Sequence, residues 1–174
     1  MKLPSDTVTR PAWEQETIIW SPVVTIPGGL IERLAGLPRK ERPMSAERQV
    51  MQDYIDALVK RADFSSYFTE DVVATFEGTD QRADGRQAAG ELIRYVHEIA
   101  FDARPELKNL LTDTGKAAIE ADFAGTHTGE FAGIQPTGRD VRVPYSVIYD
   151  LRDDQISALR IYFPMSLLIE QLTS

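Results

Sequence analysis

Apolar positions recur with a helical period in the part of the chain that follows residue 44. Ser45 is a suitable N-cap for a helix that runs to about Arg61. Its buried face is predicted from apolar residues three and four positions apart: Val50, Met51, Tyr54, Ile55, Leu58 and Val59. Asp63 can cap a short second helix. Residues 86–100 predict a third helix, whose inward positions are Ala89, Leu92, Ile93, Val96 and Ile99.

Alternation of apolar and polar positions replaces the helical period in the second half of the chain. Two long strands are expected near 117–128 and 141–149, joined by a connection rich in glycine and proline. One face of the first strand holds Ile119, Ala121, Phe123, Gly125 and His127, and one face of the second holds Val141, Val143, Tyr145, Val147 and Tyr149. Shorter strands are predicted at 72–76, 107–111 and 155–163, and a terminal helix at 167–172.

Helices first and hairpin-connected strands afterwards predict an α+β fold. We expect a cone-shaped, curved antiparallel sheet with the three N-terminal helices packed on its concave face, enclosing a pocket for a small molecule. This domain spans residues 45–174. Residues 1–44 form an N-terminal extension that holds six of the ten prolines and both tryptophans. Such an arm is expected to pack on its own domain or a partner subunit, or to cover the mouth of the pocket.

The composition narrows the class of partner. The chain has 174 residues, a net charge of −8 and scattered basic residues, which argues against nucleic acid as a partner. Cysteine is absent, so disulfides, thiol nucleophiles and thiolate metal sites are excluded. No stretch approaches the ~18 apolar residues of a membrane span, and no signal pattern opens the chain, so we expect a cytoplasmic protein without a membrane partner. The two histidines lie far apart, and we predict neither a metal nor a cofactor.

The connection between the two long strands carries a recognisable motif. Residues 125–131, GTHTGEF, and 133–139, GIQPTGR, resemble the signature of SnoaL-like polyketide cyclases, and the tail from Ile156 to Leu172 fits as well. The resemblance covers about residues 46–172. It implies the cone-shaped fold that this family shares with nuclear transport factor two, ketosteroid isomerase, limonene epoxide hydrolase and scytalone dehydratase. That fold hosts isomerases, cyclases, dehydratases, hydrolases and binding modules, so it does not fix a reaction.

One position departs from the family. The resemblance implies an acid/base aspartate at the end of the last strand, and this sequence has Pro164 there, which has no proton to exchange. Where ketosteroid isomerase would have its base, the chain has Asp80 in a polar turn, and we expect that residue to be solvated. The usual mechanism of the family therefore cannot be transferred to this chain.

His127 is the first candidate for acid/base chemistry, because it lies on the apolar face of its strand and a neutral imidazole can take and return a proton. The alternative is a structural histidine whose ring bonds a neighbouring backbone group. Tyr145 shares the apolar face of the next strand and can donate a hydrogen bond to a developing oxyanion; the alternative is a core tyrosine. His97, on the third helix, is expected at a packing edge.

Arg160 and Tyr162 share a face with the position of the missing aspartate, so we expect both to point into the pocket. A buried arginine needs a carboxylate partner, and Asp122 or Glu120 is nearest by strand order. An Asp122–Arg160 pair resembles the catalytic pair of limonene epoxide hydrolase. The alternative is that Glu120 and Asp122 lie on a solvated or subunit-facing surface. Tyr54 and Phe123, with Tyr145 and Tyr162, are predicted to line the substrate site.

We therefore predict a cofactor-independent acid/base enzyme, a cyclase or isomerase and otherwise a dehydratase or epoxide hydrolase. Its substrate is expected to be a hydrophobic small molecule such as a polyketide or terpenoid intermediate. His127, Asp122 and Arg160 are its predicted catalytic residues. The alternatives are a non-catalytic carrier or sensor on the same fold, for which Pro164 is the best argument, and a dimerisation module. A homodimer through the open sheet face is expected in each case.

Overall fold

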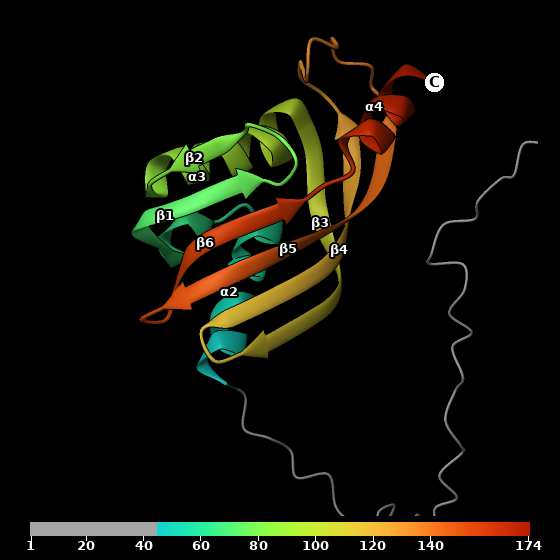
Figure 1. Cartoon of the computed structure of the whole chain (residues 1–174). Coiled ribbons are helices and arrows are strands. Elements are labelled where there is room, and N and C mark those ends of the chain that lie inside the picture. The colour runs from blue at the N-terminus through green and yellow to red at the C-terminus, as the bar shows by residue number, and fades with distance from the viewer. Residues whose placement is uncertain (1–44) are drawn as a thin grey trace, which may run out of the picture. The chain divides into compact units, whose positions relative to one another are not determined.

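The computed structural model describes residues 45–174 (Figure 1). The predictions for residues 1–44 lie outside this range. The helical elements are α2 (Ala46–Lys60), η2 (Phe64–Tyr67), α3 (Arg86–Arg94), η3 (Tyr95–Ala100) and α4 (Met165–Thr173). The strands are β1 (Phe68–Phe76), β2 (Arg82–Asp84), β3 (Phe101–Asp113), β4 (Lys116–His127), β5 (Asp140–Arg152) and β6 (Gln155–Tyr162). None of the helices in this part of the chain is long and apolar enough to cross a membrane.

Helix α2 begins and ends where the sequence predicts. The Ser45 side chain accepts a hydrogen bond from the backbone N–H of Arg48 at 3.2 Å, which satisfies one of the free donors of the first turn. Arg61 ends the helix in the left-handed conformation, with φ 56°. The buried side of the helix includes Met51, Tyr54 and Leu58, which follow the predicted stripe. This side packs against the sheet.

The sheet has six strands in the order β2-β1-β6-β5-β4-β3. Every neighbouring pair is antiparallel except β1 and β6, which run parallel. The prediction of a wholly antiparallel sheet is therefore wrong at this pair. The physical reason is that β1 and β6 are joined through all the elements between them, so no tight turn imposes an antiparallel arrangement.

The third predicted helix is in fact α3 followed by the π-helix η3. A π-helix bonds each residue to the fifth one along and so turns less per residue than an α-helix. The wider turn changes which side chains face the sheet after Arg94. Ile99, which an unbroken α-helix predicts to be buried, is 58% exposed.

The helices cover one face of the sheet, and Figure 1 shows the sheet curving around them. Strands β3 and β4 approach closely at Gly125, where a Cβ atom would lie 2.2 Å from the carbonyl oxygen of Asp102, so only glycine fits there. The apolar faces predicted for β4 and β5 both point toward the helices, with Phe123 and Val143 among the most buried residues. The α+β fold with a curved, helix-covered sheet is confirmed.

Candidate functional site

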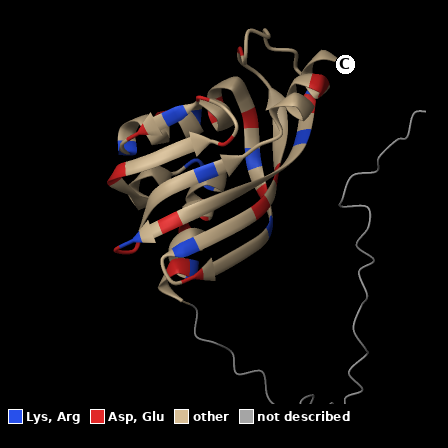
Figure 2. Cartoon of the chain, viewed as in Figure 1, with Lys and Arg blue, Asp and Glu red and all other residues tan. Residues whose placement is uncertain are grey.

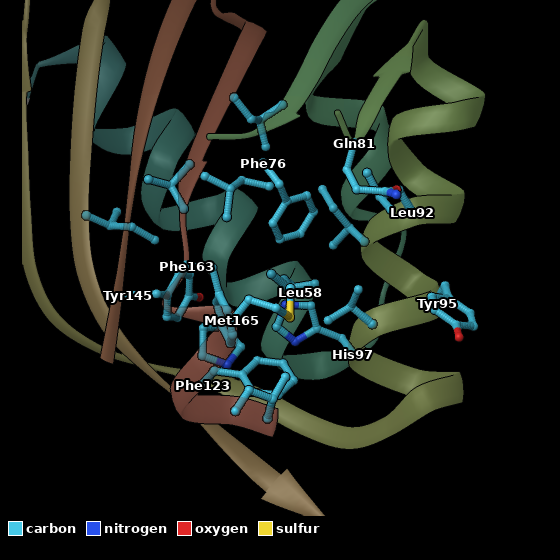
Figure 3. A pocket seen from close by; sticks show the side chains of 18 of the residues that line it. Leu58, Phe76, Gln81, Leu92, Tyr95, His97, Phe123, Tyr145, Phe163 and Met165 are labelled. Carbon is cyan, nitrogen blue, oxygen red and sulfur yellow. The ribbon is translucent and has the colours of Figure 1, made fainter. Parts of the chain in front are cut away.

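A cavity of about 450 Å³ lies between the helices and the inner face of the sheet (Figure 3). Helix α2 contributes Tyr54, Ile55 and Leu58 to its wall. The end of α3 and η3 contribute Leu92, Ile93, Tyr95, Val96 and His97. The sheet supplies Phe76 of β1 and inward-facing residues of β3 to β6, and the β4–β5 loop and α4 add further contacts. The volume is in the range of a drug-sized ligand.

Among residues 45–174, the side chains that line this cavity include no Asp, Glu, Lys or Arg. Most are apolar. The polar ones are Tyr54, Thr79, Gln81, Tyr95, His97, Tyr145 and Tyr149. Because an ionised ligand would need a charged partner to offset its loss of hydration, this lining favours a neutral and largely apolar molecule. The Tyr145 hydroxyl, the Gln81 amide and the His97 imidazole are among the groups that can orient it, whereas the Tyr95 hydroxyl donates to the carbonyl oxygen of Glu130 at 2.6 Å.

His97 reaches into the cavity from η3 (Figure 3). Its ring lies edge-on to Phe123, with 5.2 Å between ring centroids. Its Nδ1 atom is buried and has no hydrogen-bond partner among the described residues. Burial, and then the positive charge of Arg61, lower the pKa of His97 to about 4, while a hydrogen bond with the backbone of Ala103 acts in the opposite direction. The imidazole is therefore neutral at pH 7.

Three of the tyrosines that line the cavity are Tyr54 from α2 and Tyr145 and Tyr149 from β5. Burial raises the pKa of Tyr145 well above its usual value, and the same cause raises those of Tyr54 and Tyr149. The Tyr54 and Tyr149 rings meet edge-on, with centroids 5.9 Å apart. These phenols remain protonated at any ordinary pH, so they are hydrogen-bond donors in the cavity.

Three of the four predicted substrate-binding residues, Tyr54, Phe123 and Tyr145, line the cavity. Tyr162 does not. It lies on the outer face of β6 and is 47% exposed, and the expectation that it points into the pocket is wrong. The reason is the parity of β6, whose inward residues are Leu159 and Ile161, followed by Phe163.

The three predicted catalytic residues are not brought together, and none of them lines the cavity. His127 is fully buried at the end of β4. Its Nδ1 atom accepts a hydrogen bond from the backbone N–H of Thr137 at 3.2 Å and lies 3.1 Å from the hydroxyl of the same residue. This is the contact expected of a structural histidine. A catalytic role for His127 stays a prediction.

Asp122 and Arg160 lie on the outer face of the sheet in two separate ion clusters, and Figure 2 shows acidic and basic positions across β4, β5 and β6. Asp122 accepts from Lys108 at 2.5 Å and from Arg142 at 2.9 Å, and these two cations lower its pKa. Arg160 donates to both carboxylate oxygens of Asp150, at 2.6 and 3.1 Å. The predicted Asp122–Arg160 pair is therefore wrong, because the register of β5 and β6 gives Arg160 another carboxylate.

The position of the missing family aspartate is the junction of β6 and α4. Pro164 precedes the first turn of α4, where its fixed φ of −76° suits a helix start. Its neighbours Phe163 and Met165 line the cavity. Asp80 lies in the exposed β1–β2 turn as predicted, while Thr79 and Gln81 on either side of it contribute to the cavity.

His97 is the cavity residue that sequence reasoning missed. The spacing offered a signal, because His97 follows Ile93 by four residues, which places both on one side of an α-helix. The apolar neighbours Val96 and Ile99 obscured that signal, since they suggested a core-facing stripe with the histidine at its edge.

A curved sheet with helices on one face and an apolar cavity between them is the architecture of the α+β cone folds. The sequence profile of the SnoaL-like polyketide cyclases matches residues 48–172, and the chain belongs to that family.

Solved structures agree with the family assignment. A protein from Jannaschia sp. CCS1 assigned as a SnoaL-like polyketide cyclase superimposes with a TM-score of 0.69 at 17% identity, over 78% of this chain and 98% of that chain. AclR from Streptomyces galilaeus, assigned as a hydroxylase, superimposes with a TM-score of 0.64 at 21% identity, over 75% of this chain and 86% of that chain. An LEH-like epoxide hydrolase from M. tuberculosis superimposes with a TM-score of 0.59 at 16% identity, over 73% of this chain and 89% of that chain. At these identities the likeness establishes the fold. No curated protein matches the chain by sequence.

Proposed function

We propose that this protein is an acid/base enzyme that moves a proton within a neutral, hydrophobic small molecule such as a polyketide or terpenoid intermediate. The reaction would be a cyclisation or an isomerisation, or else a dehydration or epoxide opening, and no cofactor takes part. The observation that carries the proposal is the imidazole of His97 in the cavity wall: its buried Nδ1 atom has no hydrogen-bond partner among the described residues, and none of the described residues that line the cavity is charged. Membership of a family of small-molecule enzymes supports it.

His97 is the proposed proton acceptor. A pKa near 4 keeps its imidazole unprotonated at neutral pH, so Nδ1 can accept a proton from a carbon next to a carbonyl group. Such a base is weak on its own. The negative charge that develops on the substrate oxygen stabilises the new imidazolium in the apolar cavity, and the imidazolium is then acidic enough to return the proton at another position.

Tyr145 is the proposed donor to the substrate oxygen. Its hydroxyl stays protonated because burial raises its pKa, and it lies in the wall supplied by the sheet, whereas His97 lies in the wall supplied by the helices. A hydrogen bond to the oxygen strengthens as negative charge develops there, which is the general way in which such donors lower a barrier. Tyr54 and Phe123 complete the ligand contacts from α2 and β4.

The proposal is tested by hydrogen–deuterium exchange into a neutral bicyclic ketone that has hydrogens next to its carbonyl group, such as 2-tetralone, followed by mass spectrometry in deuterated buffer. Wild-type protein should speed exchange at the carbon between the carbonyl group and the aromatic ring. His97→Gln keeps the size and polarity but cannot serve as the base, and the rate should fall by about 10² or more. Tyr145→Phe should lose about tenfold or more. Exchange at the wild-type rate in His97→Gln would remove His97 from the mechanism.

The same assay tests the roles predicted for His127 and Asp122. If His127→Asn and Asp122→Asn lose turnover while His97→Gln does not, the acid/base chemistry belongs to the predicted residues. The geometry favours His97, because it is the histidine that lines the cavity.

A carrier or sensor is the second candidate function. It is favoured by Pro164 at the position of the family's acid/base aspartate, and by a cavity in which no Asp or Glu lies among the described lining residues. Native mass spectrometry of freshly purified protein identifies a bound molecule. An enzyme should convert that molecule when the protein is incubated with it, and a carrier should release it unchanged.

We also propose a homodimer that forms through the outer face of the sheet. Ala124 and Thr126 are uncharged and half-buried on this face of β4. Light scattering after size exclusion should give twice the monomer mass, and Thr126→Arg should reduce it. A monomer in the wild type contradicts this part of the proposal and leaves the cavity chemistry untouched.

A further inference from the structure

The β4–β5 loop, residues 128–139, forms part of the cavity wall through Phe131 and Ala132. We call this segment the cavity loop. At its start the backbone N–H groups of Thr128 and Gly129 both donate to the carbonyl oxygen of Ala100, at 3.0 and 2.9 Å. A Cβ on Gly129 would lie 2.3 Å from the Ile99 carbonyl oxygen, so this close contact depends on glycine. The first part of the loop is thus fixed to the end of η3.

The far end of the cavity loop is held by His127. The backbone N–H of Thr137 donates to His127 Nδ1 at 3.2 Å, and Gly138 N–H donates to the His127 carbonyl oxygen at 3.0 Å. The His127 N–H donates in turn to the carbonyl oxygen of Arg139 at 2.9 Å. Of these bonds, the one at Nδ1 is the bond that depends on the histidine side chain.

This contact selects the tautomer of the imidazole. A backbone N–H can only donate, so Nδ1 must present a lone pair and the ring proton must sit on Nε2. Nε2 is buried and has no partner among the described residues, and the whole residue is 0% exposed. A side chain with no access to solvent and no opening onto the cavity is poorly placed to exchange protons with a ligand.

The imidazole also fixes the aromatic contacts behind the cavity wall. Its ring lies on that of Phe101, with 4.9 Å between centroids and 34° between planes. Phe101 contacts Phe131 of the cavity loop edge-on at 5.2 Å. His127 therefore supports the loop in two ways, through the Thr137 backbone and through the Phe101 ring on which Phe131 packs.

We propose that His127 is a positioning residue, which holds the cavity loop so that Phe131 and Ala132 close the wall, and thereby sets the affinity of the cavity for its ligand. The proposal rests on the proposed function only in assuming that the cavity binds an apolar ligand. It differs from the catalytic role predicted for His127, because a positioning residue needs a hydrogen-bond acceptor and no proton transfer.

Four variants isolate the contact. His127→Asn retains an acceptor oxygen close to the Nδ1 position, and His127→Leu removes the acceptor. Thr137→Pro removes the backbone donor from an exposed position, and Thr137→Val, its matched control, removes the hydroxyl while keeping the N–H. The two readouts are amide hydrogen exchange of a peptide that covers residues 128–139 and the affinity for N-phenyl-1-naphthylamine, a neutral apolar dye that fluoresces in apolar sites.

We expect His127→Leu and Thr137→Pro to exchange faster in the cavity loop, with β1 unchanged, and to bind the dye about five- to tenfold more weakly. His127→Asn and Thr137→Val should stay within about twofold of the wild type. Thr137→Pro keeps the test valid if His127→Leu does not fold.

Unchanged loop exchange in Thr137→Pro overturns the proposal. So does an equal loss of dye affinity in His127→Asn and His127→Leu, since that result indicates a need for the imidazole itself. If the wild type does not bind the dye, the cavity part of the proposed function fails, and loop exchange alone then decides the positioning role: faster exchange upholds it and unchanged exchange overturns it.

Discussion

The two faces of the sheet differ in the charge of the side chains that they carry. The inner face, which lines the cavity, presents aliphatic and aromatic side chains, and its polar groups are the phenols of Tyr145 and Tyr149. The neutral imidazole of His97 faces the same cavity from η3. The outer face carries paired ions, among them Asp122 with Arg142 and Asp150 with Arg160. Alternate residues of the same strands build both faces. The ions of the outer face named above are paired with one another, whereas the polar side chains that face the cavity are uncharged.

The largest expected difference between the faces concerns packing. Phe123 is 1% exposed on the inner face and contacts the rings of Phe101, His97 and Phe163. Phe123→Ala should lower the free energy of unfolding by about 3–5 kcal/mol, because it removes buried surface and leaves a void. The matched outer-face change is Ile148→Ala at a site 37% exposed, where about 1 kcal/mol or less is expected. Urea denaturation measures both, and equal losses would contradict the distinction between the two faces.

A second prediction uses the pH dependence of stability to distinguish the cavity from the outer face of the sheet. The pKa of His97 is about 4 in the folded protein and about 6.5 in the unfolded chain, so the unfolded chain takes up the proton first as pH falls. The contribution of neutral His97 to the free energy of unfolding should therefore be fully present above about pH 6.5. It should be lost as the pH falls toward 4, which lowers the free energy of unfolding by on the order of 3 kcal/mol.

His97→Gln is the control for this pH dependence, and its stability should change less over the same interval. Urea denaturation at a series of pH values provides the measurement. A decline of equal size in His97→Gln would assign the effect to other groups.

The smallest expected effect belongs to the ions of the outer face. Arg160, and then Lys116, lower the pKa of Asp150 to about 2, so the stability that this carboxylate contributes is present above about pH 4 and lost as pH falls toward 2. Because the pair is partly exposed and screened by solvent, Asp150→Asn should cost only about 0.5–1 kcal/mol at pH 7, and less at high salt. Dye affinity should not change. A clear loss of dye binding in Asp150→Asn would mean that the outer face influences the cavity.

The sequence by itself determined the elements and the fold class. Helical spacing located α2, the Ser45 cap located its first residue, and alternation identified the inward residues of β4 and β5, including Phe123 and Tyr145. The glycine- and proline-rich connection after His127 was sufficient to suggest the family. These features are local, and side-chain period and capping depend on residues only a few positions apart.

Only the tertiary structure decided which residues share the cavity. Alternation defines two faces of β6, but it does not say which face meets the helices, so Arg160 and Tyr162 were predicted on the wrong side. Strand register, which sequence period does not fix, gave Arg160 the carboxylate of Asp150. The π-helical turn at the end of α3 moved Ile99 outward, and tertiary packing brought His97 into the cavity. Each outcome depends on contacts between segments far apart in the chain, and those contacts exist only once the sheet and helices have packed.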